Sequence, residues 1–148
     1  MYEDQMDIAF AGMKADSGND RVESFPVGAD TLAFGVVTGT DSGGLLVAGP
    51  GTKVRGITVH SHAVRGTTYV KTECASVMTR GLVWALVTAS GAVTEDGPVS
   101  FAANGTVANA GANLLANAVF RSGKITVSGV DIALVELHNP FSETDTAA

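Results

Sequence analysis

The chain has 148 residues, of which 45% are hydrophobic and only 16% are charged, and its formal net charge is −6. This length predicts a single domain, and the acidic balance argues against direct nucleic-acid binding, which needs a basic face. Because soluble domains carry about 25% charged residues, the low value indicates surface that is hidden in an assembly. No apolar run approaches the roughly 18 residues of a membrane span. The start of the chain is acidic and lacks the basic segment of a signal peptide, so we expect a soluble protein made without an export signal.

Residues 1–20 are predicted to form an N-terminal arm. They contain five acids and one lysine, whereas residues 21–138 contain eight acids and eight basic residues. The glycine-, asparagine- and aspartate-rich run 12–20 predicts a loop. We therefore expect an arm that is mobile in isolation, with acids that are either solvated or directed to a basic partner.

Apolar side chains alternate with acidic or small residues near the start of this arm, a strand-like pattern that can pair with a neighbour. Burial of a few such side chains can offset the ordering of a short segment only. The candidate contacts with a partner or a second subunit are therefore Met6, Ile8, Phe10 and Met13.

Between residues 32 and 70 the chain predicts short strands separated by glycine-rich turns, at 32–38, 45–47, 54–62 and 67–70. In the third of these, His60 and His62 share one face of the strand, as a pair of metal ligands in a cupin-type barrel would. A catalytic metal needs about three protein ligands, and no supporting glutamate follows before Glu73. Hydrogen-bonded structural histidines or a subunit contact are the favoured interpretation.

The stretch 76–101 is predicted to form the core. In a strand over residues 82–88, alternate side chains face opposite sides, and both sides are apolar, so a second sheet or another subunit should cover each. The chain's single tryptophan lies here, and replacing a buried tryptophan with alanine costs on the order of 3–5 kcal/mol. The predicted structural core consists of Trp84, Leu82, Leu86, Phe101 and Leu134.

The alanine- and asparagine-rich run 102–117 predicts an irregular loop, because glycine and asparagine oppose a helix. Strands are expected at 118–121, 125–127 and 130–138, and Pro140 ends the last, leaving a tail over 139–148. Short strands at this spacing predict an all-β fold, either a jelly-roll-like sandwich or a barrel of antiparallel strands, in one domain over 21–138.

Motifs for catalysis are weak. The run Asp41-Ser42-Gly43-Gly44 resembles the loop around a protease serine, but all three histidines follow Ser42, which is the wrong order for that class. Cys74 is the single cysteine, so neither an intrachain disulfide nor a thiolate metal cluster can form; we expect it to be a small buried hydrophobic residue. We predict no enzyme activity and no cofactor or metal site.

Five stretches, in their order and spacing, resemble the structural cement, or capsid decoration, proteins of tailed bacteriophages. They are residues 11–18 (AGMKADSG), 32–37 (LAFGVV), 54–62 (VRGITVHSH), 80–85 (RGLVWA) and 97–101 (GPVSF). The resemblance runs over about residues 9–138.

This resemblance implies a small jelly-roll-like protein without catalytic residues. It would be made in the host cytoplasm and bind the outer capsid surface of the virion across subunits of the major capsid protein. It would act as a homo-oligomer, a dimer or trimer, with no nucleic acid or membrane as partner. The alternatives are a small metal-dependent cupin-like enzyme using His60 and His62, and a secreted sugar-binding sandwich, which the low aromatic content of 6% disfavours.

Overall fold

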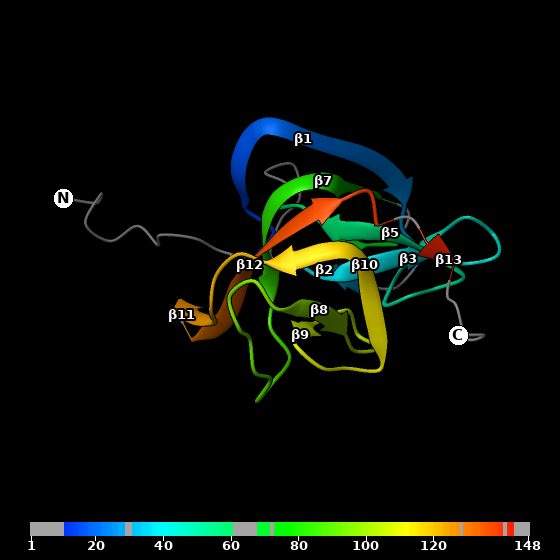
Figure 1. Ribbon diagram of the computed structural model, residues 1–148. Coiled ribbons are helices and arrows are strands. Elements are labelled where there is room, and N and C mark those ends of the chain that lie inside the picture. The colour runs from blue at the N-terminus through cyan, green and yellow to red at the C-terminus, as the bar shows by residue number, and fades with distance from the viewer. Residues whose placement is uncertain are drawn as a thin grey trace.

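The computed structural model describes residues 11–28, 31–60, 68–71, 73–127, 129–140 and 142–143, with the side chains of 16–19 and 142–143 left out. These residues form antiparallel strands and turns and contain no helix, which confirms the predicted all-β fold (Figure 1). Consequently, no helix in the described ranges is a candidate membrane span.

The strands differ widely in length. Two of them, β1 and β7, are longer than the short strands that the sequence predicts. In chain order the strands are β1 Lys14–Pro26, β2 Thr31–Ala33, β3 Val37–Thr40, β4 Leu46–Ala48, β5 Lys53–Thr58, β6 Thr68–Val70, β7 Cys74–Leu86, β8 Pro98–Phe101, β9 Val107–Ala108, β10 Asn113–Phe120, β11 Ile125–Val127, β12 Val130–His138 and β13 Ser142–Glu143.

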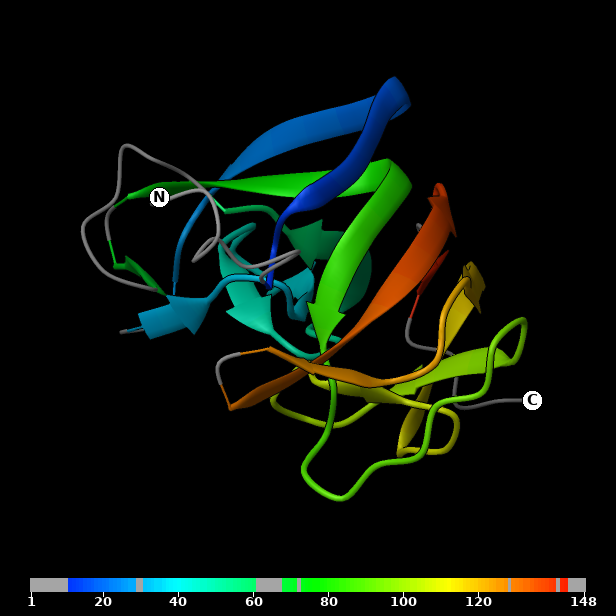
Figure 2. The same cartoon turned by 90° about the vertical axis from the view of Figure 1, so that its left-hand side faces the viewer.

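Strand β7 is shared by both halves of the main sheet. Along one edge it pairs with β1, and along the other it pairs first with β5 and then with β12. The first half of the sheet therefore runs β4-β3-β5-β7, and the second runs β7-β12-β10-β8-β9. A separate small sheet, β2 with β6, completes the fold. Figure 2 shows β1 following the bend of β7 between the two halves.

The bend in β7 lies at the change of partner. Met78 pairs with Ile57 of β5, whereas Arg80 pairs with His138 of β12. Gly81 follows at a φ of 124°, in the region that favours glycine. Strand β1 changes register at the same place, and an ion pair of 2.8 Å between Lys14 and Asp20 spans its irregular part.

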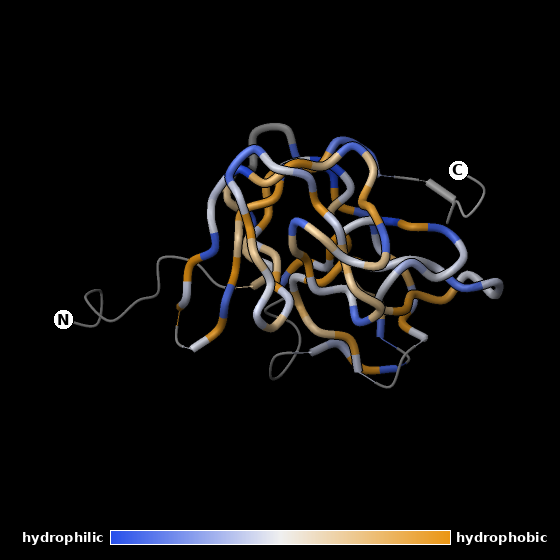
Figure 3. The backbone as a smooth tube through the Cα atoms, turned by 60° about the horizontal axis from the view of Figure 1, so that its bottom comes forward, coloured by the Kyte–Doolittle hydropathy of each residue, from blue (hydrophilic) through white to orange (hydrophobic). Residues whose placement is uncertain are grey.

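Two apolar clusters cover opposite faces of the first half of β7. Met78, together with Val83 and Ala85 further along the strand, belongs to the larger cluster, which fills the space between the two half-sheets. Ala75 and Val77 belong to the smaller one, which includes the small sheet through Leu32 and Tyr69. In Figure 3 the apolar segments follow the central strands, and hydrophilic residues gather at the outer turns.

The structure corrects the predicted core. The buried face of the second half of β7 carries Val83 and Ala85, both at 0% exposure, and Val87, directly after the strand, continues it at 7%. Trp84, Leu82, Leu86 and Leu134 lie on the other side and are half-buried, so of the predicted core set Phe101 alone is fully buried. Alternation was therefore predicted correctly, but not which face is inward. Of the four half-buried residues, Leu86 packs against the smaller cluster.

Three further expectations are wrong. The predicted loop over 12–20 contains the start of β1, because from Gly12 onward the backbone bonds to the free edge of β7. The predicted loop over 102–117 contains β9 and the first half of β10. Cys74 is exposed rather than buried, since it begins β7 outside either cluster.

The contact between β5 and β7 provides a test of this architecture. A Cβ atom at Gly56 would lie 2.1 Å from the carbonyl oxygen of Met78, so the strands can approach only because residue 56 has no side chain. We expect Gly56→Ala to lower the free energy of unfolding by at least the roughly 1–3 kcal/mol typical of overpacking, measured by urea denaturation. Gly123→Ala is the matched control, because no atom lies within 4 Å of its added Cβ. Equal stability of the two variants would contradict the close strand contact.

Candidate functional site

One side of the second half-sheet is incompletely covered and combines apolar with charged side chains. It is formed by alternate positions of β7 and β12, which the ladder places in register as Trp84 with Leu134, Leu82 with Glu136, and Arg80 with His138. Arg121, directly after β10, joins them because its backbone N–H donates to the carbonyl of Leu134 at 2.8 Å. These residues are called the outer face: Arg80, Leu82, Trp84, Arg121, Leu134, Glu136 and His138.

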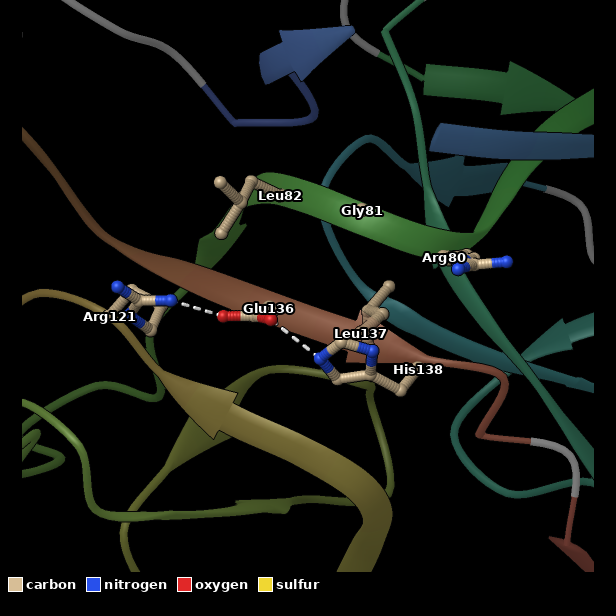
Figure 4. A pocket seen from close by; sticks show the side chains of 7 residues that line it. All are labelled: Arg80, Gly81, Leu82, Arg121, Glu136, Leu137 and His138. Carbon is tan, nitrogen blue, oxygen red and sulfur yellow. Dashed lines mark hydrogen bonds and ion pairs between the residues drawn. The ribbon is translucent and has the colours of Figure 1, made fainter. Parts of the chain in front are cut away.

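A carboxylate lies at the centre of the outer face. Glu136 accepts a hydrogen bond from the guanidinium of Arg121 and lies 2.5 Å from Nε2 of His138 (Figure 4). The hydrogen bond from Arg121, followed by the one with His138, lowers the pKa of Glu136. The same contact with Glu136 raises the pKa of Arg121. Glu136 is therefore ionised at neutral pH and fixes both neighbours on this face.

The charges on the outer face do not balance. Arg80 is exposed and makes no ion pair with any side chain in the described part of the chain. Arg121 and His138 share a single carboxylate on this face. Arg121 also lies 4.0 Å from the exposed carboxylate of Asp96. Arg80 is therefore the arginine on this face that has no carboxylate partner among the described side chains, and it can attract an acidic group.

A hollow of about 200 Å³ opens on this face, lined by Arg80, Gly81, Leu82, Arg121, Glu136, Leu137 and His138 (Figure 4). Small-molecule sites usually enclose about 300–1,000 Å³, so this hollow is small for a cofactor. Its lining has both an apolar part, from the half-buried Leu82, and guanidinium groups, from Arg80 and Arg121. An apolar side chain with an acidic neighbour on the same segment would fit both parts.

Of the four predicted contact residues, the structure describes Met13. Met6, Ile8 and Phe10 lie outside the described residues. Met13 is half-buried, and its carbonyl accepts a hydrogen bond of 3.0 Å from the backbone N–H of Trp84. The structure therefore places Met13 in the body beside the outer face.

Of the predicted histidine pair, the structure describes His60. The ring of His60 packs edge-on against Phe34, with centroids 4.9 Å apart, while His62 lies outside the described residues. Within those residues, no group of three or more histidine, cysteine, aspartate or glutamate side chains could hold a metal ion. Around Ser42, the Asp41 carboxylate accepts hydrogen bonds from the backbone N–H groups of Gly43 and Leu45 at 2.9 and 3.0 Å, as expected for a polar turn.

The charged residues of the outer face were not singled out from the sequence. A signal existed for β12, where Leu134, Glu136 and His138 alternate with buried positions. Arg80 and Arg121 carry no such signal, because only the pairing of β7, β12 and β10 brings them together.

The lowered pKa of Glu136 predicts a pH-dependent contribution to stability. A depressed folded-state pKa stabilises the protein above the unfolded pKa of about 4.3, and this stabilisation disappears as pH falls through the folded value. We expect Glu136→Gln to lower the free energy of unfolding at pH 7 by up to about 1 kcal/mol, the range for solvent-exposed pairs.

Urea denaturation of both proteins from pH 7 to pH 3 measures this effect, and the difference between them should vanish at the acidic end. Glu95→Gln, in an exposed turn, is the control. A difference that stayed constant over this pH range would show that Glu136 acts through packing rather than charge.

Comparisons with known proteins address the identity of the chain. No curated protein matches it. Its fold is similar to that of a chain in the solved structure "The capsid of Myoviridae Phage XM1", with a TM-score of 0.72 and 19% identity, over 90% of this chain and 92% of the other.

A family model gives a second and more specific result. The model described as "Structural cement protein (E217 gp24/Pam3 gp6)" matches residues 1–138, a range that includes every described strand except β13. This confirms the resemblance inferred from the sequence. The chain belongs to the structural cement protein family.

Proposed function

We propose that the protein is a capsid decoration protein of a tailed bacteriophage. In this role it binds the outer surface of the major capsid protein shell in the virion and stabilises the shell without catalysis. The observation that carries the proposal is the family match over residues 1–138. Synthesis in the host cytoplasm, before attachment to the shell, is part of the same proposal.

The structure supports a role in binding rather than chemistry. A protein that stabilises a shell needs a rigid body and uncovered surface with which to join neighbours. The two-sided packing of β7 supplies the body, and the outer face supplies half-buried apolar side chains beside cations. Such a mixture of apolar and cationic groups is typical of the residues that anchor protein interfaces.

Homo-oligomerisation, as a dimer or trimer, belongs to this proposal. Several copies on one shell bind with increased avidity, because each attached copy raises the effective concentration of the next. The low charge content of 16% is consistent with surface that becomes buried in such an assembly. Residues 1–10 of the predicted arm are proposed to order at this stage, on the shell or on a neighbouring copy.

The cupin-like alternative has no observation in its favour. It depends on His60 and His62 as ligands, and the described one of these packs against Phe34.

Sedimentation with capsids tests the proposed function. We expect the purified protein to co-sediment with mature, empty capsids of its phage and to raise the temperature at which these shells open. Capsids of an unrelated phage serve as the control. Failure to co-sediment at saturating protein concentration would contradict the proposal.

Deletion of residues 1–10 tests the role of the arm. The described fold begins with Ala11, and Gly12 is already hydrogen-bonded to Trp84, so the body should keep nearly the same midpoint of thermal unfolding. Capsid binding should weaken, because the arm contacts are lost. If the truncation unfolded the body instead, these ten residues would belong to the protein's own core.

A further inference from the structure

We propose that the outer face of one copy is the binding site for residues 1–10 of a second copy. In this contact, Met6, Ile8 and Phe10 cover Leu82, Trp84 and Leu134, and the acids of the same segment approach Arg80 at the rim. The inference rests on the proposed homo-oligomer and identifies the surfaces that join its subunits.

The apolar part of the outer face lacks a complete cover among the described residues. Trp84 and Leu134 are opposite each other in the ladder, Leu82 is next along β7, and all three are half-buried. Beside them, the hollow of about 200 Å³ between Leu82 and Arg121 has room for one side chain rather than a larger ligand. A short segment that projects an apolar side chain at every second residue suits this surface.

Charge favours the arm as the occupant. The first ten residues contain Glu3, Asp4 and Asp7 and no lysine or arginine. The outer face has Arg80, without an ion pair to any described side chain, together with Arg121 and His138, which share Glu136. Arg121 also lies 4.0 Å from Asp96, so Arg80 is the cation at the rim that an acidic segment can neutralise.

The path of the chain favours binding of residues 1–10 to the outer face of a second copy rather than to that of the same molecule. Lys14 pairs with Val83, and the backbone N–H of Gly12 donates to the carbonyl of Trp84 at 2.7 Å, so the chain runs toward Leu86 as it is followed back to its start. The N–H of Leu86 is already bonded to Gly35 at 2.8 Å. At Gly12 the described chain therefore lies beside Trp84 and leads away from Arg80 and His138.

To reach Arg80 and His138 on its own molecule, the segment would have to turn back on itself before residue 11. An extended segment of ten residues instead spans up to roughly 33–36 Å, enough to reach an adjacent molecule. In this proposal the outer face of each copy therefore takes residues 1–10 of another.

A complementation experiment with the full-length chain tests the contact in the absence of capsids. The arm variant carries Ile8→Asp and Phe10→Asp, and the face variant carries Leu82→Asp, each placing a charge in the apolar contact. We expect sedimentation velocity to show concentration-dependent association of the wild type, weakened more than about tenfold in either variant alone. An equimolar mixture should regain association, because one variant retains the face and the other retains the arm.

Leu114→Asp is the matched control. This leucine is 68% exposed on β10 and pairs with Ser100 of β8, outside the outer face, so association should not change. Arg80→Glu, at an exposed position, replaces the face variant if near-ultraviolet circular dichroism shows that Leu82→Asp does not fold.

Three results would overturn the inference. They are a monomeric wild type at all micromolar concentrations, variants that associate like the wild type, or a mixture that does not regain association. A shift of Trp84 fluorescence in the arm variant at every concentration, without any change in association, would show that the arm binds its own molecule. Co-sedimentation with capsids, measured in parallel, separates failure of this contact from failure of the proposed function.

Discussion

The fold depends on a single strand that belongs to two half-sheets. Along one edge β7 pairs with β1, and along the other it pairs with β5 and then with β12. The change of partner requires a bend, which Gly81 permits, and a close approach to β5, which Gly56 permits. Because both halves hydrogen-bond to the same strand, neither can separate without losing its backbone hydrogen bonds to β7. The larger apolar cluster lies between the two halves.

The same bend produces the functional asymmetry of the molecule. The first half of β7 has an apolar cluster on each face. In the second half, Val83 and Ala85 belong to the larger cluster, while Leu82 and Trp84 on the other face extend beyond the smaller one. A capsid-stabilising protein needs a body that does not deform and a surface that other molecules can bury. In the proposed function, the first half of β7 belongs to the rigid body and the second half provides the surface for association.

The sequence predicts much of this fold but little of its tertiary arrangement. Alternation in 82–88 and 130–138 predicts strands correctly, and the ordered motifs predict the family, since both depend on local pattern. Alternation alone cannot tell which face of a strand is inward, and so Trp84 was assigned to the core. In the structure Val83 and Ala85 take that place, because their face meets the other half-sheet.

The loop predicted over 12–20 shows a different limit. Glycine, asparagine and aspartate oppose a strand locally, yet β1 forms there because β7 offers an unpaired edge. The candidate site has the same origin. Arg80, Arg121 and His138 are far apart in the sequence, and only the order β7-β12-β10 brings their side chains to one face. Long-range strand pairing is thus the information that a single sequence lacks.

The two sides of the second half-sheet differ in burial, and we propose that one is core and the other is a surface for association. The most direct measurement compares Phe101→Ala with Trp84→Ala in urea unfolding and in sedimentation of the free protein. Phe101 is 1% exposed, so its replacement should cost about 3–5 kcal/mol of unfolding free energy. Trp84→Ala should cost clearly less and should instead weaken self-association. A larger loss of stability for Trp84→Ala than for Phe101→Ala, with association unchanged, would contradict the account.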